Sequence, residues 1–316
     1  MPLEAKVYLT RARITEFYTG YNTIGYGNAY ISFSGGKDST VLLDIARKIY
    51  PEIPAVFSNT GLEYPEIRRF AKAHDNVEVV QPKIPFNEVI SKYGYPMISK
   101  EVSQAIYYAR RIDGSKSSVW GRNELTGKRG MFSKEKYLRL ATDVPFNISN
   151  YCCSAMKKLP LKQYQRDNGT HPILATMAEE SDRRKSSWLK SGCNSFSGDI
   201  MSRPMSFWTE QDVMQYIIEN DLEICSVYGD IVAVDEAGNE YDPKTMLTDG
   251  CKLKCTGCDR TGCIYCGFGA HLERGETRFQ RLAKTHPRQY EYCMGGGQWV
   301  DNPAYDPAAP EYDGIW

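Results

Sequence analysis

Residues 32–40 read Ser-Phe-Ser-Gly-Gly-Lys-Asp-Ser-Thr, between a strand-like segment at 29–31 and a helix-like segment at 41–46. Two adjacent glycines between a strand and a helix let the backbone approach a ligand and direct amide N–H groups at it. Lys37 adds a positive charge, and Asp38 is suited to hold Mg²⁺. The stretch therefore predicts a phosphate-binding loop at the carboxyl end of the first strand.

The segments after this loop continue to alternate between strand and helix. Strand patterns at 53–58 and 77–80 flank a helical pattern at 63–74. This βαβαβ order predicts an α/β fold with a doubly wound, mostly parallel sheet that has helices on both faces. Ligands bind beyond the carboxyl ends of the strands in such sheets. The phosphate-binding loop falls there, and so do residues 59–63, which read Asn-Thr-Gly-Leu-Glu.

Further elements are expected along the chain. Helices are expected at 4–18 and 179–190, a buried strand at 172–177, and a hairpin with a strand at 231–234 and a turn at 236–239. Thr209 and Asp212 have the spacing of a capping box and are expected to begin a further helix. A loop at 113–136 and the tail after 297 are expected to be irregular. We predict two domains, a nucleotide-binding α/β domain at 1–225 and a Cys-rich metal-binding segment with a tail at 226–316.

Composition points to a globular protein. The chain has 316 residues, of which 41% are hydrophobic and 25% charged. No apolar run approaches the ~18 residues of a membrane span, and residues 1–6 lack the apolar core of a signal peptide. We therefore expect a cytoplasmic protein without a membrane partner.

Charge is unevenly distributed although the net charge is zero. Residues 100–190 carry twice as many basic as acidic side chains. This excess is typical of a surface that binds a polyanion and equally of solvated helix faces. Aromatic residues interleave with the basic ones at 100–139, a pattern that favours nucleic-acid binding by charge and stacking. The aromatic residues are Tyr107, Tyr108, Trp120 and Tyr137.

Ten cysteines in such a chain favour metal binding or catalysis over disulfides. Three features stand out: the adjacent pair Cys152-Cys153, the CxxC turn at 263–266, and a second CxxC turn at 255–258 with Cys251 before it. The two turns together match a zinc knuckle formed by Cys255, Cys258, Cys263 and Cys266. The alternative is a [4Fe–4S] cluster held by Cys152, Cys153, Cys263 and Cys266, and spacing does not decide between the two. Cys193 and Cys225 fit buried, inert thiols.

The loop differs from a Walker A loop and resembles the S-G-G-x-D-S pyrophosphate loop of the ATP pyrophosphatase superfamily, whose members cut ATP between the α and β phosphates. Within it, residues 28–290 resemble the phosphoadenosine phosphosulfate (PAPS) reductase-like family. The motifs that carry this resemblance lie at 34–39, 59–63, 152–153 with Lys157 and Pro160, 179–184, 208–213 and 261–266.

Three chemistries occur in that family: sulfonucleotide reduction, sulfate adenylylation, and the ATP- and cluster-dependent sulfur insertion of DndC-like proteins. Sulfonucleotide reductases usually have a degenerate loop and a nucleophilic cysteine in a C-terminal Glu-Cys-Gly-Leu-His segment. Here the loop is intact, that segment is absent, and Cys293 has a different context. The chain therefore looks most like DndC-like members. By this resemblance Cys152, Cys153, Cys263 and Cys266 are cluster ligands. It assigns no role to Cys251, Cys255 and Cys258, which are the alternative metal ligands, either of a second site that lacks a ligand or in competition for the first.

The expected reaction is ATP cleavage with adenylylation of an acceptor, coupled to iron–sulfur-assisted sulfur transfer, with nucleic acid as one acceptor. A cysteine desulfurase or thioredoxin is the expected protein partner. The alternatives are a PAPS or adenylyl-sulfate reductase that releases sulfite, and a nucleotide-binding protein with a structural zinc site.

Each site residue has an expected role in this reaction. Lys37, Asp38, Ser39 and Arg184 are the expected catalytic residues. ATP and Mg²⁺ are expected to contact Ser34, Gly35, Gly36, Lys37, Asp38, Ser39, Thr40, Thr60, Gly61, Glu63 and Arg183.

Overall fold

The computed structural model describes residues 1–20, 28–111, 144–244 and 251–294. Its contacts divide the chain into two compact units. The first consists of Met1–Asn59, Glu63–Val80 and Leu161–Thr261, and the second of Thr60–Leu62, Gln81–Pro160 and Gly262–Trp316. The single boundary expected after residue 225 stays a prediction. The loop expected at 113–136 and the tail after residue 297 lie outside the described residues, as do Trp120 and Tyr137.

The first unit contains a six-stranded sheet with the strand order β3-β2-β1-β5-β7-β6. All neighbouring strands are parallel except β6 and β7, which are antiparallel. This confirms the mostly parallel α/β fold. The strands are β1 (Ala29–Phe33), β2 (Ala55–Ser58), β3 (Val77–Val80), β5 (His171–Ile173), β6 (Asn194–Ser195) and β7 (Met201–Ser202).

Side chains from helices cover both faces of this sheet. On one face, Tyr30 of β1 and Val56 of β2 pack against Tyr164 of α8 (Leu159–Asn168). Phe33 points to the opposite face, because it lies an odd number of residues after Tyr30. Its ring centroid is 5.1 Å from that of His74, which follows α3 (Pro65–Ala73). Burial on both sides explains why β1 is an almost continuous apolar strand.

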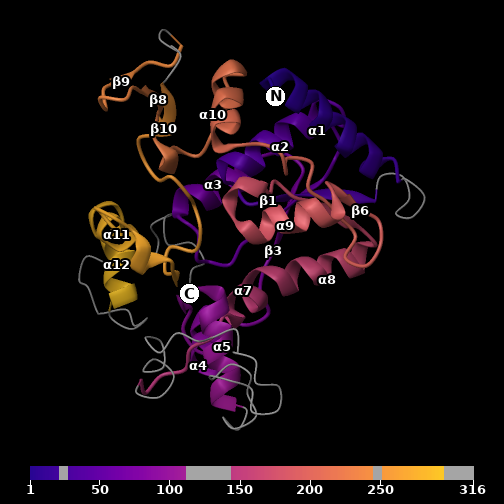
Figure 1. The fold of residues 1–316 in the computed structure, drawn as a ribbon. Coiled ribbons are helices and arrows are strands. Elements are labelled where there is room, and N and C mark those ends of the chain that lie inside the picture. The colour runs from indigo at the N-terminus through magenta and orange to yellow at the C-terminus, as the bar shows by residue number, and fades with distance from the viewer. Residues whose placement is uncertain (21–27, 112–143, 245–250, 295–316) are drawn as a thin grey trace, which may run out of the picture. The chain divides into compact units, whose positions relative to one another are not determined.

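Three helices of the first unit pack against one another (Figure 1): α1 (Leu3–Tyr18), α2 (Lys37–Arg47) and α10 (Glu210–Glu219). Lys6 of α1 forms an ion pair with Asp212 of α10. Tyr216 Oη of α10 donates to Asp44 Oδ2 of α2 at 2.6 Å. The capping box is confirmed, because Thr209 Oγ1 accepts the N–H of Asp212, and Asp212 Oδ2 accepts the N–H of Thr209.

Two expected elements are shorter than the sequence suggested. The strand expected at 172–177 ends at Ile173 in β5. The helix expected at 179–190 is a 3₁₀ turn (Ala178–Glu180) followed by α9 (Asp182–Ser191). The break occurs at Ser181, which has an extended backbone and whose Oγ accepts the N–H of Arg184 as an N-cap.

The hairpin expected near 231–239 is confirmed. Strands β8 (Ile231–Val234) and β9 (Glu240–Tyr241) pair antiparallel, and β10 (Lys252–Cys255) pairs with the other edge of β8. A 3₁₀ turn (Ser226–Tyr228) precedes β8. The N–H of Cys258 donates to Val227 O at 2.9 Å, so that the turn after β10 is bonded to this segment.

The second unit has its own small core of Val102, Ile106 and Ile148. Strands β4 (Met97–Ile98) and β11 (Gly267–Phe268) pair parallel. Its helices are α4 (Phe86–Tyr93), α5 (Lys100–Arg111), α7 (Tyr151–Cys153), a π-helical turn (Ser154–Lys158), a 3₁₀ turn (Ala270–Leu272), α11 (Arg278–Thr285) and α12 (Pro287–Met294). Throughout the described part of the chain, the helices are too short or too polar to cross a bilayer.

Candidate functional site

The loop between β1 and α2 makes the turn that its glycine pair predicts. Gly35 has a φ of +70°, and a Cβ there would lie 3.0 Å from Ile67 Cγ2. A Cβ on Gly36 would lie 3.1 Å from Tyr228 Oη. The first position therefore requires glycine for its backbone conformation and the second for its limited space. The amide N–H groups of the first turn of α2 consequently lie at the carboxyl end of β1.

The hydroxyl groups of the loop bind mainly to the loop itself. Ser34 Oγ and Ser39 Oγ are 3.0 Å apart, and Ser39 Oγ also donates to Gly36 O at 2.8 Å. Thr40 Oγ1 donates to the same carbonyl at 3.1 Å. Thr40 and Gly35 therefore shape the loop without lining the cavity beside it.

That cavity has a volume of about 270 Å³, and all its lining residues belong to the first unit. Its wall is formed by the loop, the chain after β5, the start of α9 and two segments later in the sequence. The lining residues are Ser32, Ser34, Gly36, Lys37, Asp38, Ser39, Leu174, Ala175, Thr176, Glu180, Arg184, Tyr228, Arg260 and Thr261. Five of the predicted loop residues and the predicted Arg184 thus meet at one cavity.

Lys37 is almost completely buried in this wall. Its Nζ lies 3.0 Å from Glu210 Oε1 and 3.6 Å from Asp38 Oδ1, and it donates to Asp259 O at 3.1 Å. Burial alone would lower the pKa of Lys37, but Asp38, Glu210 and Tyr228 together outweigh burial and raise it. Lys37 therefore carries a stable positive charge at the loop.

The carboxylate of Asp38 is paired with Lys37 but lacks a hydrogen bond at its buried oxygen. Its Oδ1 is buried and makes no hydrogen bond to any group that the structure describes. Burial raises the pKa of Asp38 more than the positive charge of Lys37 lowers it. A buried carboxylate oxygen without a hydrogen bond is costly, whereas Mg²⁺ takes oxygen ligands. The donor chemistry at Asp38 thus fits a magnesium ion.

Two guanidinium groups that line the cavity lie beside one carboxylate. Arg184 Nη1 bonds to Glu180 Oε1, and Arg260 Nη1 lies 3.8 Å from Glu180 Oε2. Burial lowers the pKa of Arg184, and the nearby charge of Arg260 adds to this effect. Guanidinium groups suit phosphate oxygens because their N–H groups form a planar fork. Arg183 is exposed and does not line the cavity, so its predicted contact stays a prediction.

Sequence reasoning missed several residues of this wall. Tyr228 Oη accepts the N–H of Lys37 at 3.1 Å and shares a hydrogen bond of 2.7 Å with Thr261 Oγ1. Glu180 and Thr261 lie in motifs that carry the family resemblance, and these motifs were the signal in the sequence that could have identified both residues. Tyr228 and Arg260 lie outside those motifs, and only the fold places them here.

Residues 59–63 do not contribute to the lining of this cavity in the described chain. Thr60 Oγ1 accepts the N–H of Leu62 at 3.1 Å, and Gly61 has a φ of +75°. Thr60 and Gly61 belong to the second unit, whereas Glu63 is a buried residue of the first. Their predicted contacts with ATP stay predictions.

The second unit contains four of the cysteines that the sequence singled out, and Cys152 and Cys153 end helix α7. The N–H of Cys266 donates to Cys263 O at 3.0 Å, which closes the CxxC turn. The hydrogen bond to Cys153 and burial raise the pKa of Cys152, and the charges of Cys153, Cys263 and Cys266 raise it further. The thiols of Cys153, Cys263 and Cys266 therefore lie within electrostatic reach of Cys152.

Three lysine side chains place positive charge near Cys153, one of these four cysteines. The hydrogen bond from Cys152 lowers the pKa of Cys153, and the charges of Lys100, Lys157 and Lys158 lower it further. Four thiols, one of them favoured as a thiolate, are compatible in number and type with the ligands that a [4Fe–4S] cluster takes. Among the residues described, no three His, Cys, Asp or Glu side chains are arranged to hold a single metal ion.

The remaining cysteines of the CxxC region belong to the first unit. Cys255 ends β10, and burial raises its pKa to about 11. Cys258 is buried in the turn that follows. The four cysteines of the zinc-knuckle alternative are thus divided between the two units, and that alternative stays a prediction.

Substitution of Gly36 tests the geometry of the loop. In Gly36→Ala the new Cβ would crowd the hydroxyls of Tyr228 and Thr261 at 3.1 and 3.2 Å. We expect the free energy of unfolding to fall by about 1–3 kcal/mol and ATP binding to weaken. Thermal unfolding and ATP titration measure the two effects. Gly262→Ala is the matched control, because a Cβ there meets nothing within 4 Å. Equal losses in the two variants would contradict this geometry.

Comparison with known proteins gives partial matches to individual chains. A stretch of 69 residues is 39% identical to the uncharacterized protein MJ0973 of Methanocaldococcus jannaschii, and this match covers 21% of the chain and 17% of that relative. The PAPS reductase of Candida auris, in a phosphate complex, covers 72% of the chain and 90% of its own length, with 15% identity and a TM-score of 0.37. The U34-tRNA thiolase NcsA of Methanococcus maripaludis, with its [4Fe–4S] cluster, covers 93% and 78%, with 11% identity and a TM-score of 0.38.

A match to a protein family covers most of the chain. The family described as the phosphoadenosine phosphosulfate reductase domain matches residues 28–118 and 120–267. This range contains both the loop at 34–39 and the CxxC turn at 263–266. The family resemblance predicted from the motifs is confirmed, whereas the closer likeness to DndC-like members stays a prediction. The chain belongs to the phosphoadenosine phosphosulfate reductase domain family.

Proposed function

We propose that this protein is an ATP pyrophosphatase that adenylylates an acceptor and replaces the adenylate with sulfur. Family membership supports an enzyme that uses a nucleotide in sulfur chemistry. The observation that carries the narrower proposal is the cavity at the loop. There the first turn of α2 places the buried ammonium of Lys37 beside Asp38, whose Oδ1 makes no hydrogen bond in the described residues. This arrangement suits the β,γ-diphosphate and Mg²⁺ of ATP.

Different residues of the cavity have different roles in the first step, the adenylylation of the acceptor. The acceptor oxygen bonds to the α-phosphorus, the bond from that phosphorus to the bridging oxygen breaks, and pyrophosphate leaves with the electron pair. Lys37 and the N-terminal amides of α2 neutralise the charge that develops on the leaving group. Arg184 and Arg260 hold the oxygens of the α-phosphate or of the acceptor, displacing Glu180. Catalysis in this account consists of positioning and electrostatic stabilisation.

The second step uses the second unit. A sulfur nucleophile attacks the activated atom of the acceptor, and AMP leaves. Cys152, Cys153, Cys263 and Cys266 would hold a [4Fe–4S] cluster, which supplies redox or sulfur-carrying chemistry when bound. Sulfur would come as sulfide, or as the persulfide of a cysteine desulfurase, and in the second case a dithiol such as thioredoxin would supply the two electrons that release the outer sulfur as sulfide. A nucleic acid is the acceptor that the basic composition of residues 100–190 favours.

Asp38→Asn tests the magnesium role. Loss of the carboxylate charge removes the hard anionic ligand, so we expect a severalfold higher Mg²⁺ concentration for half-maximal pyrophosphate release. A magnesium titration at fixed ATP measures this shift. Asp44→Asn lies on the same helix, where its carboxylate bonds Tyr216 and Lys48 instead of the cavity. The magnesium dependence of that variant should match the unaltered protein. An unchanged requirement in Asp38→Asn would remove Asp38 from the metal site.

The proposed reaction is tested by its products. Anaerobically purified protein is incubated with Mg-ATP, sulfide and total nucleic acid, and AMP and pyrophosphate are quantified. Parallel incubation with PAPS and thioredoxin measures sulfite. Equal amounts of AMP and pyrophosphate are expected. Sulfite formation without ATP cleavage would identify a sulfonucleotide reductase instead, and nucleotide binding without any product would identify a binding protein.

A further inference from the structure

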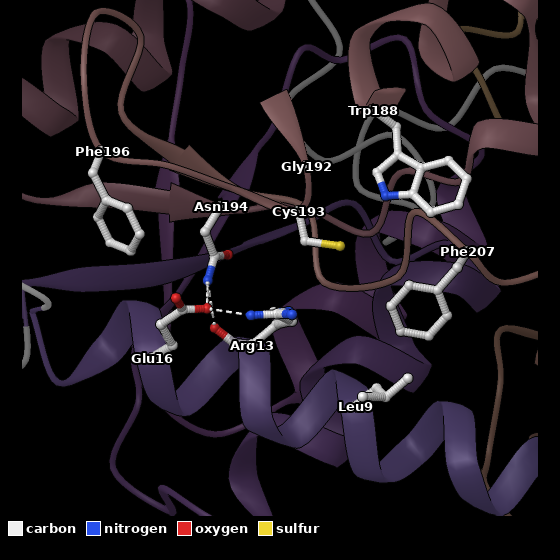
Figure 2. Close-up of a pocket in the computed structure, with 9 residues that line it drawn as sticks. All are labelled: Leu9, Arg13, Glu16, Trp188, Gly192, Cys193, Asn194, Phe196 and Phe207. Atoms are coloured by element: carbon white, nitrogen blue, oxygen red, sulfur yellow. Dashed lines mark hydrogen bonds and ion pairs between the residues drawn. The ribbon is translucent and has the colours of Figure 1, made fainter. Parts of the chain in front are cut away.

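The first unit has a second cavity, of about 390 Å³. It shares no lining residue with the cavity at loop 34–39, the nucleotide cavity. Figure 2 shows side chains from α1, from the end of α9 and from the segment around β6 converging on it. The proposed reaction does not use this cavity. Its lining residues are Leu9, Arg13, Glu16, Trp188, Gly192, Cys193, Asn194, Phe196 and Phe207.

One wall of this cavity is apolar and largely aromatic. Leu9, Trp188 and Phe207 stand together on it, and all three are half-buried (Figure 2). Phe196 closes the other end, held by Phe17 at a ring separation of 5.7 Å. Aromatic faces that line an accessible cavity suit a planar ring, because stacking buries the flat faces of both partners.

The floor of the cavity is polar and nearly neutral in charge. Arg13 Nη1 lies 2.9 Å from Glu16 Oε2. Asn194 Nδ2 donates to the same Glu16 oxygen at 2.8 Å and to Arg13 O at 3.0 Å, as Figure 2 shows. These bonds leave Arg13 Nη2 as a donor and Glu16 Oε1 as an acceptor that bond to no group in the described residues. The floor can therefore both donate to and accept from a ligand.

This combination selects among classes of ligand. An aromatic anion would need an unpaired positive charge, but Glu16 already neutralises Arg13. A purely apolar ligand would leave the polar floor unsatisfied. A neutral planar ring with donors and acceptors along one edge satisfies both the floor and the aromatic wall, and nucleobases have this character. We propose that this cavity is a nucleobase-binding site.

The position of Trp188 places this site next to the nucleotide cavity. Trp188 lies four residues after Arg184 in α9, and residues at this spacing lie on the same face of a helix. One face of α9 therefore lines both cavities. A nucleic-acid strand with one base in the aromatic cavity would pass along this helix toward Arg184. The site itself does not depend on the proposed reaction.

Binding of nucleosides tests the proposal directly. Calorimetric titration of the whole protein uses the four common ribonucleosides, a short single-stranded oligonucleotide of mixed sequence, and benzoate as a planar anion. At least one nucleoside or the oligonucleotide should bind saturably, and benzoate should not. Nucleoside binding indicates a site for free bases, whereas binding of the oligonucleotide alone indicates a strand, and both support the proposal. Binding of neither, or binding of benzoate as tight as that of the nucleosides, would overturn it.

Variants locate the binding. Trp188→Leu should weaken it about fivefold or more, because stacking on the indole is lost. Leu189→Ala is the matched control, since this neighbouring side chain is 72% exposed and does not line the cavity. Arg13→Gln, at an exposed position, should also weaken binding. This variant replaces Trp188→Leu in the test if circular dichroism shows that Trp188→Leu is unfolded. Unchanged affinity in the folded variants would overturn the proposal. Loss of nucleoside binding in Lys37→Met would do so as well, because it would assign that binding to the nucleotide cavity.

Discussion

Replacing Lys37 with methionine is expected to reduce the rate of pyrophosphate release by about 10²- to 10³-fold, the usual effect of removing one preorganised group that stabilises transition-state charge. Methionine keeps the length and apolar stem of the side chain but removes the ammonium group. Lys37 Nζ is surrounded by Asp38, Glu210 and the carbonyl of Asp259, which hold it at the loop. Quenched-flow measurement of pyrophosphate at saturating Mg-ATP determines the change.

The control for this prediction lies at the other end of the same helix. Lys48 is the C-cap of α2, where its Nζ bonds Asp44 at 2.8 Å and Asn220 at 2.8 Å, and it does not line the cavity. Lys48→Met should therefore leave the rate within about twofold, because only partly exposed contacts are lost. A comparable fall in both variants would mean that Lys37 acts through folding and not through charge on the leaving group.

Replacing both cysteines of the CxxC turn, Cys263→Ala with Cys266→Ala, is expected to abolish cluster binding. Anaerobically purified protein should contain about four iron and four acid-labile sulfide per chain, as one Cys₄ cluster requires. The double variant should contain almost none, because two of the four proposed thiolate ligands are gone. Sulfur transfer should be lost with it, whereas ATP binding should persist, since the cavity at Lys37 is built by the first unit.

A double variant of two cysteines outside the four proposed ligands controls for the general effect of losing thiols. Cys193→Ala with Cys225→Ala removes two cysteines of the first unit and should leave iron and sulfide unchanged. A metal content of one zinc per chain, without acid-labile sulfide, would contradict the proposal of a cluster and favour the zinc site. Iron retained in Cys263→Ala with Cys266→Ala would show that other residues hold it.

Much of the fold was predictable because its signals are local. The glycine pair at 35–36 requires a turn, and the apolar run of β1 requires burial on both faces, so the loop and the parallel sheet follow from short stretches. The capping box at Thr209 and Asp212 is likewise encoded within four residues. The early end of β5 was not predictable, because Leu174 to Met177 are as apolar as a strand although Leu174 and Ala175 line a cavity.

The rest of the candidate site depends on contacts between distant residues. Tyr228 bonds the backbone of Lys37 across 191 positions, and Asp259 accepts from its Nζ across 222. No local pattern marks these partners, because their roles arise only when the turn before β8 and the segment after β10 pack beside the loop. The second cavity was invisible for the same reason, since Arg13 and Asn194 meet across 181 positions.

The central claim is that the protein cleaves ATP between the α and β phosphates. Phosphorus-31 NMR of the reaction of anaerobically purified protein with Mg-ATP, sulfide and total nucleic acid tests this claim most directly. The account predicts AMP, free or attached to the acceptor, and pyrophosphate in equal amounts, both absent in Lys37→Met. Formation of ADP and phosphate, or bound ATP that stays intact while PAPS yields sulfite, would contradict it.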